Sequence, residues 1–156
     1  MTYTSNLDDN YNPYPGMIFT DPAPNTDGDW AKYGCFDHVD YTDKDINAKV
    51  FLGILSGDKE LVAKETGKEN PKVLSAGPDD TVFTYFIDHG DDDIICVGDD
   101  DVTSSELMTA LKTAYEKKLY GKWVWFMEAC HSGSMFGALP KDMNIYVMTS
   151  ADADHN

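Results

Sequence analysis

A histidine and a cysteine each follow an apolar run of the chain, and these two residue types can together carry out covalent acyl transfer. His89 comes at the end of the run TVFTYFID, and Cys130 comes at the end of the run KWVWFMEA. In such chemistry a thiolate attacks, and a nearby imidazole takes the thiol proton or stabilises the anion. The same imidazole can then protonate the leaving amine. The sequence therefore indicates Cys130 as a candidate nucleophile and His89 as its general base.

Small residues surround both candidates. Gly90 follows the histidine, and Ser-Gly-Ser at 132–134 comes soon after the cysteine, so a substrate backbone can approach closely. The backbone N–H groups of Gly90 and Cys130 can point at a developing oxyanion. A cysteine or histidine taken alone is more often structural, and it is the joint placement of the pair that favours a function. We interpret His131 and His155 as solvent-exposed rather than catalytic.

The elements around these residues predict how they are brought together. Both apolar runs are rich in β-branched and aromatic residues, which is typical of strands buried on both faces. Between them, Thr103 and Glu106 form a capping-box pattern for a helix over 104–119. The order strand, helix, strand predicts a βαβ unit with parallel strands, and open α/β sheets bind ligands at the carboxyl edge of such strands. Because neighbouring strands lie about 4.8 Å apart, His89 and Cys130 are expected to be close in space.

The flanking segments extend this α/β pattern. Apolar residues recur at helical spacing over 46–62, with Asn47 or Thr42 as the candidate N-cap and Gly57 as the candidate stop. The segment 144–150 predicts a third apolar strand. With 156 residues, 42% of them hydrophobic, the chain is long and apolar enough to form one folded domain.

The charge balance excludes some partners. The chain has 28 acidic and 12 basic residues, and its formal net charge of -16 repels polyanions, so we expect no nucleic-acid partner. A strongly acidic surface loses self-repulsion as carboxylates protonate, and we therefore expect the protein to work in an acidic compartment. The apolar runs are too short to span a bilayer, and the N-terminal residues carry no signal-peptide core.

No pattern in the sequence predicts a metal or cofactor site. Cys35, Cys96 and Cys130 lie far apart without a C-x-x-C pair, so neither a zinc ribbon nor a disulfide framework is indicated. The runs Asp91–Asp93 and Asp99–Asp101 lack the glycine and the closing glutamate of a calcium-binding EF-hand loop. We interpret both aspartate runs as solvated loop charge, and we interpret Cys96 as a core residue.

Several segments resemble the legumain (asparaginyl endopeptidase) family of cysteine peptidases, which belongs to the caspase-like clan. IDHG and EACHSGSM resemble the family's His-Gly and Glu-Ala-Cys-x-Ser-Gly-Ser blocks. NPYPGMIF, FLGILSGD and VLSAGPDDTVFTYFIDHG resemble further family segments. These blocks follow the family's order and approximate spacing along most of the chain, which is thus identified as similar to that family.

The resemblance implies a caspase-like α/β fold, with a mostly parallel sheet flanked by helices, and a Cys130/His89 dyad. It implies hydrolysis after asparagine, or after aspartate at lower pH, in peptide or protein substrates, and a lysosomal or vacuolar location. It also implies that Glu128 helps to form the pocket for the asparagine side chain. A carboxylate there can accept a hydrogen bond from the substrate amide, and the alternative for Glu128 is an internal salt bridge.

The resemblance is incomplete at the start of the chain. The family's catalytic domains begin with a further strand and helix, which carry an asparagine that orients the histidine and an Arg-His pair that holds substrate, and this chain has no match for them. We therefore expect residues 1–156 to form a single partial peptidase domain with an exposed sheet edge. The alternatives are a catalytically impaired fragment or pseudoenzyme that acts as a binding protein, and an enzyme like glycosylphosphatidylinositol transamidase.

Overall fold

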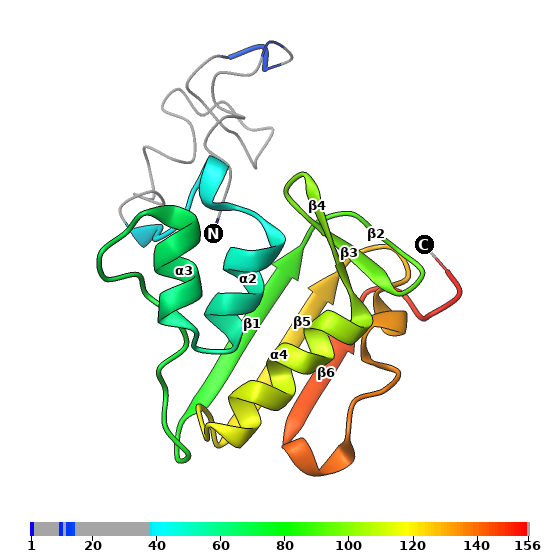
Figure 1. The fold of residues 1–156 in the computed structure, drawn as a ribbon. Helices are drawn as coiled ribbons and strands as arrows, with labels where there is room; N and C mark the ends of the chain where they lie inside the picture. Colours follow the sequence, from blue (N-terminus) through cyan, green and yellow to red (C-terminus); the bar gives the residue numbers. More distant parts are fainter. Residues whose placement is uncertain (2–9, 11, 15–37, 156) are drawn as a thin grey trace. The chain divides into compact units, whose positions relative to one another are not determined.

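The chain divides into two compact units, Met1–Ile46 and Asn47–Asn156. The computed structural model describes residues 1, 10, 12–14 and 38–155 (Figure 1). In the first unit, the described residues include a short 3-10 helix, η3 (Asp43–Asp45). Cys35 lies outside the described residues. The second unit holds both candidate catalytic residues.

A parallel three-stranded sheet forms the centre of the second unit (Figure 1). Its strands are β1 (Thr81–Ile87), β5 (Lys122–Glu128) and β6 (Ile145–Thr149), in the order β1-β5-β6. β5 pairs in parallel with both neighbours. The α/β class and the parallel arrangement predicted from the strand, helix, strand order are therefore confirmed, as is the third strand.

Three helices accompany the sheet: α2 (Ala48–Leu55), α3 (Lys59–Thr66) and α4 (Ser104–Glu116). Asn47 caps α2 by accepting a hydrogen bond from the Val50 N–H at 3.0 Å. The predicted capping box of α4 is present, with both reciprocal bonds between Thr103 and Glu106. α2 ends just before Gly57, as predicted, but a separate helix, α3, then begins with its own N-cap, Asp58.

A small antiparallel sheet follows β1. It consists of β2 (Gly90–Asp91), β3 (Ile94–Val97) and β4 (Asp100–Thr103). The prediction that both aspartate runs are loops is wrong in part, because several of these aspartates lie in β2 and β4. The turns between the strands use left-handed backbone at Asp93 (φ 59°) and Gly98 (φ 72°). Glycine and aspartate tolerate this conformation, so the composition that suggested loops also permits tight hairpins.

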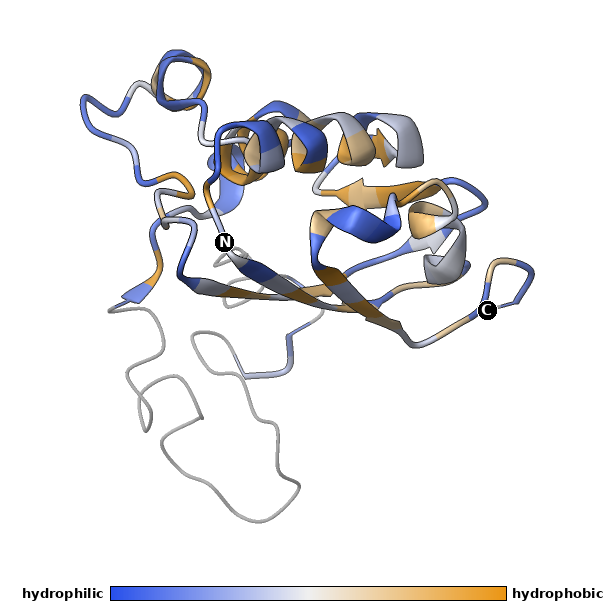
Figure 2. Ribbon diagram, turned by 90° about the horizontal axis from the view of Figure 1, so that it is seen from below, coloured by the Kyte–Doolittle hydropathy of each residue, from blue (hydrophilic) through white to orange (hydrophobic). Residues whose placement is uncertain are grey.

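The described helices gather on one side of the parallel sheet (Figure 2). On that side Phe51 of α2 packs against Phe86 of β1, with ring centroids 5.7 Å apart, and Trp125 of β5 is fully buried. On the other side apolar residues are exposed, including Phe83 (61%) and Tyr146 (57%). The prediction that β1 is buried on both faces is therefore wrong for the described residues. Alternate strand residues point to opposite faces, and the described helices cover only one of them.

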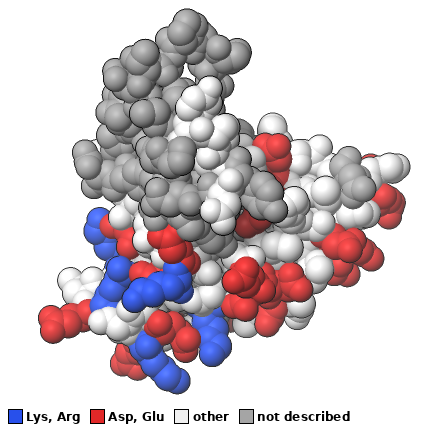
Figure 3. All heavy atoms as spheres, turned by 90° about the horizontal axis from the view of Figure 1, so that it is seen from above, with Lys and Arg blue, Asp and Glu red and all other residues white. Residues whose placement is uncertain are grey.

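The surface seen in Figure 3 is unevenly charged. On one side of that view acidic side chains form groups without basic ones between them, and on the other side lysines and acidic residues mix. The aspartates at 91–93 and 99–101 are all exposed. Groups of one sign disfavour anionic partners by direct repulsion. Within the described ranges, no helix has both the length and the hydrophobicity needed to cross a bilayer.

Candidate active site

His89 and Cys130 follow adjacent parallel strands at the same edge of the sheet. Ile87, the last residue of β1, lies opposite Glu128, the last residue of β5, so each candidate comes two residues after a matched pair. The two segments then remain in contact, because a Cβ atom placed on Gly90 would lie 2.6 Å from the carbonyl oxygen of Cys130. The structure thus brings the His89-Gly90 backbone directly against that of Cys130.

Backbone contacts fix the position of His89 along the chain. Its N–H donates to Asp88 Oδ1 at 2.8 Å, and its carbonyl accepts a hydrogen bond from the Cys96 N–H at 2.9 Å. The imidazole itself is exposed, and among the described residues no group is hydrogen-bonded to it. No described residue therefore holds the ring in one orientation by a hydrogen bond.

The two amides expected to bind an oxyanion have no acceptor within the described part of the chain. The bond from Cys96 to His89 makes Gly90 and Ile95 a non-hydrogen-bonded pair of the antiparallel ladder, so the Gly90 N–H lies outside that ladder. The Cys130 N–H comes after the end of β5 and has no backbone acceptor there either. Unpaired N–H donors at such a point are what an oxyanion site requires. The Cys130 thiol is free and half-buried.

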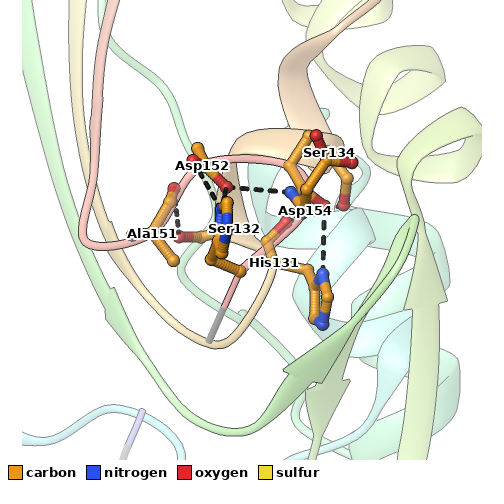
Figure 4. Close-up of polar contacts among 8 residues, drawn as sticks. His131, Ser132, Ser134, Ala151, Asp152 and Asp154 are labelled. Atoms are coloured by element: carbon orange, nitrogen blue, oxygen red, sulfur yellow. Dashed lines mark hydrogen bonds and ion pairs between the residues drawn. The ribbon is translucent and has the colours of Figure 1, made fainter.

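The residues from Cys130 to Ser134 form a tight turn, which we call the nucleophile turn because it begins at the candidate nucleophile (Figure 4). His131 has left-handed backbone (φ 51°, ψ 22°), and the 3-10 helix η4 (Ser132–Phe136) follows it. The fully buried Ser132 hydroxyl donates to the Ala151 carbonyl at 3.3 Å and accepts from the Ala151 N–H at 3.2 Å. A Cβ atom on Gly133 would lie 2.8 Å from the Asp152 carbonyl carbon. The turn therefore packs closely on the chain that follows β6.

Ser134 links the nucleophile turn to the small antiparallel sheet. Its hydroxyl donates to the His131 carbonyl at 2.7 Å and accepts a hydrogen bond from the Asp93 N–H at 2.8 Å. Sequence reasoning explained the Ser-Gly-Ser motif only by the small size of its residues. In the structure each of the three has a specific contact, and these contacts depend on tertiary neighbours that the sequence does not reveal.

Glu128 ends β5 with its carboxylate exposed. The Tyr85 hydroxyl donates to Glu128 Oε2 at 3.1 Å, and this hydrogen bond raises the pKa of Tyr85 because the carboxylate stabilises the protonated phenol. Among the described residues Glu128 forms no ion pair, so the salt bridge considered as its alternative role is not found there. One carboxylate oxygen is occupied by Tyr85, and the other is available to an external donor.

The other histidines differ from one another in their surroundings. His155 is exposed, as expected, and pairs with Asp152 at 2.7 Å; this hydrogen bond lowers the pKa of Asp152. His131 was expected to be solvent-exposed, but only 22% of its side chain is exposed. Its Nδ1 atom lies 3.0 Å from the Ala153 carbonyl oxygen, and its Nε2 atom lies 3.9 Å from Asp91 Oδ1. No sequence pattern pointed to this contact.

Cys96 is half-buried in β3, and its thiol donates to Asp101 Oδ1 at 3.6 Å. Burial, together with this contact, raises the pKa of the Cys96 thiol and makes it a poorer nucleophile. Across the described residues, no three histidine, cysteine, aspartate or glutamate side chains converge so as to hold a metal ion.

Comparison with known proteins gives a consistent result. A sequence profile described as Peptidase C13 family matches residues 1–156. Legumain of Mus musculus is 39% identical over 152 residues, which cover 97% of this chain and 33% of the mouse protein. Hemoglobinase of Schistosoma japonicum is 41% identical over 146 residues (93% and 31%), and vacuolar-processing enzyme delta-isozyme of Arabidopsis thaliana is 36% identical over 144 residues (91% and 29%). The chain thus spans about a third of the length of these relatives.

Proposed function

Because the chain belongs to the Peptidase C13 family, we propose that it carries the nucleophile and the general base of a cysteine endopeptidase. The observation that supports this most directly is the pairing of β1 and β5. Their parallel register puts the His89-Gly90 backbone against that of Cys130. The N–H groups of Gly90 and Cys130 have no acceptor in the described part of the chain. Cys130 is the nucleophile in this proposal, and His89 is the base.

The reaction follows from these groups. His89 takes the thiol proton, and the Cys130 sulfur attacks the carbonyl carbon of the scissile peptide bond. The carbonyl oxygen becomes an oxyanion that the N–H groups of Gly90 and Cys130 stabilise. The C–N bond then breaks, the amine takes the proton from His89, and a thioester remains. Water that gives a proton to His89 hydrolyses this thioester, releasing the carboxylic acid and restoring the thiol.

Cleavage after asparagine is the specificity we propose, with Glu128 as the residue that recognises the side chain. Tyr85 holds one carboxylate oxygen of Glu128, which leaves the other to accept a hydrogen bond from the substrate amide. An aspartate side chain has no such donor when it is ionised. It acquires an O–H donor on protonation, so cleavage after aspartate requires lower pH.

We place this activity in an acidic lysosomal or vacuolar lumen. One relative is named for vacuolar processing, and the net charge of -16 means that protonation relieves repulsion within this chain. Residues 1–156 as a single partial peptidase domain remain a prediction, and the substrates proposed are peptides or proteins with an accessible asparagine.

Covalent labelling of the whole protein tests the proposal. The probe is an asparagine-containing peptide with a thiol-reactive electrophile, applied at about pH 5.5, in the acidic range of the compartment proposed above. We expect the wild type and Cys96→Ala to be labelled and Cys130→Ala to remain unlabelled. Equal labelling of the Cys130→Ala protein would reject this cysteine as the nucleophile. A folded wild type that takes no label would instead favour a binding protein without catalysis.

A further inference from the structure

The segment that follows β6, Ala151–His155, runs beside the nucleophile turn (Figure 4). The His131 N–H donates to the His155 carbonyl at 3.0 Å, and the Gly133 N–H donates to the Ala151 carbonyl at 3.2 Å. Together with the two bonds of the Ser132 hydroxyl to Ala151, these contacts fasten the turn to the segment at several points along its length. The backbone just after Cys130 is thus held by a part of the chain that comes much later in sequence.

The side chain of His131 adds a contact that constrains its chemistry. Its Nδ1 atom lies 3.0 Å from the Ala153 carbonyl oxygen, which can only accept a hydrogen bond. Nδ1 must therefore carry the hydrogen in this arrangement. The opposite ring nitrogen faces Asp91 of β2. His131 comes three residues after the end of β5 and contacts Ala153, which follows β6, and Asp91, which follows β1, so it links the segments that come after the three parallel strands.

The backbone of His131 is in a conformation that most side chains avoid. Its φ of 51° and ψ of 22° lie in the left-handed region, where a Cβ atom is crowded and glycine and asparagine are favoured. This conformation reverses the chain immediately after Cys130, so the thiol stays at the edge of the sheet. An unfavourable backbone persists when surrounding contacts hold it in place, and the contacts to the segment 151–155 do so here.

We propose that His131 is a positioning residue for the nucleophile. Its left-handed backbone and its Nδ1–H bond to Ala153 together lock the nucleophile turn onto the segment 151–155, and this fixes the orientation of the Cys130 thiol and N–H. It transfers no proton in the reaction. The proposal rests on the proposed function only in taking Cys130 as the nucleophile. Misorientation of a nucleophile and an oxyanion donor is felt in the transition state, so loss of the lock lowers kcat and leaves KM unchanged.

Three substitutions separate the backbone effect from the hydrogen bond. Asparagine tolerates the left-handed conformation and has an amide N–H₂ close to the position of Nδ1, so His131→Asn keeps both features. Glycine tolerates the conformation but has no donor, and alanine lacks both. We expect the kcat of His131→Asn to stay within about threefold of the wild-type value. The kcat of His131→Gly should fall about tenfold, because the positioning hydrogen bond is lost, and the kcat of His131→Ala should fall further, because the turn is lost as well.

The alkylation rate of Cys130 by iodoacetamide, measured in a background that carries both Cys35→Ala and Cys96→Ala, reports on this thiol alone, without requiring substrate or catalysis. We expect the alkylation rate to rank the three variants in the same order as kcat does. The matched control is Lys118→Gly, which relieves left-handed backbone (φ 56°) at the end of α4 and leaves both kcat and the alkylation rate unchanged.

Two results would overturn the proposal. One is a His131→Gly protein with wild-type kcat and a wild-type alkylation rate. The other is a set of variants that differ in thermal midpoint but not in either rate, which would mean that His131 serves stability alone. A wild type that does not cleave peptides would contradict the proposed function, while the ranking of alkylation rates would still decide whether His131 positions the thiol.

Discussion

At the level of single residues, Gly90 shows how little space separates the two candidate catalytic segments. A Cβ atom there would lie 2.6 Å from the Cys130 carbonyl oxygen and 3.1 Å from the Ala129 Cβ atom. Backbone on one side and a buried side chain on the other leave no flexible group that can move aside. The absence of a side chain at Gly90 is therefore a condition for the two segments to touch.

We predict that Gly90→Ala lowers the free energy of unfolding by about 1–3 kcal/mol, the usual cost of overpacking, and abolishes labelling of Cys130 by the asparagine-directed probe. Urea denaturation and labelling of the folded fraction measure the two effects. Gly137→Ala is the control, because the nearest atom to its Cβ would be 3.8 Å away and its backbone is right-handed. A Gly90→Ala protein as stable and as reactive as the wild type would contradict the close contact.

The stability of the protein at alkaline pH is predicted to depend on Tyr120. The buried Tyr120 hydroxyl donates to the Met143 carbonyl at 2.9 Å, and burial raises the pKa of Tyr120 to about 12. The raised pKa means that the folded state disfavours the ionised phenol, so this contribution is complete below about pH 10 and is lost as pH rises from about 10 towards 12. Tyr120→Phe should show a weaker fall in stability over this window.

The same variant should be less stable near neutral pH by about 1 kcal/mol, because it loses one buried hydrogen bond. Urea midpoints measured from neutral to alkaline pH test both parts. Tyr146→Phe serves as the control, since Tyr146 is exposed and its loss should change neither slope nor midpoint. If the urea midpoints of the wild type and of Tyr120→Phe changed with pH in parallel, Tyr120 would not be the source of the alkaline loss of stability.

Residue identities pointed to part of the candidate site in advance. Cys130, His89 and Gly90 could be selected from the sequence because their types suit acyl transfer and each follows an apolar run. The contacts of His131 could not be predicted from the sequence, since they depend on a left-handed backbone angle and on a carbonyl group more than twenty positions later in the chain. Contacts of that kind arise only when distant segments pack together.

At the level of elements, local chemistry was a good guide to the starts of α2 and α4, although it missed α3 and its N-cap Asp58. Thr103 and Glu106 were predicted to cap α4, and they do so through bonds of 2.9 and 3.2 Å that involve both backbone N–H groups. The aspartate-rich strands β2 and β4 were not predicted as strands. The buried side chains of Ile95 in β3 and Val102 in β4 stabilise the small sheet by tertiary packing, which overrides the poor strand propensity of aspartate.

The capping box makes the stability of the start of α4 depend on pH. Hydrogen bonds from the Thr103 backbone and hydroxyl lower the pKa of Glu106. A lowered pKa contributes stability above the ordinary glutamate range and loses it as pH falls through the folded-state pKa. We expect Thr103→Ala to cost about 1 kcal/mol near neutral pH, and Glu106→Gln to reduce the loss of stability between about pH 5 and pH 3.

Helical circular dichroism during urea titration at each pH measures these effects. Ser105→Ala, one position further along α4, is the control, because its side chain takes no part in the cap. A Thr103→Ala protein with an unchanged midpoint would show that tertiary packing alone holds the start of the helix.

For the whole molecule, the dominant property is the net charge of -16. Exposed carboxylates of one sign repel one another, and partial protonation weakens that repulsion. We predict that the thermal midpoint at about pH 5.5 equals or exceeds that at about pH 7.5, and that the difference shrinks at high ionic strength, where charges are screened. A steady fall in stability from pH 7 to pH 5, unaffected by salt, would contradict this prediction.

The order of the strands has a consequence for the timing of folding. Cys130 follows the middle strand, β5, and the turn behind it is fastened to residues that come after β6. While the chain is still being made on the ribosome, the cysteine is synthesised before the segment to which its turn is fastened. A growing polypeptide therefore carries a turn that is not yet fastened, and under our proposal its thiol becomes aligned only after translation has passed His155.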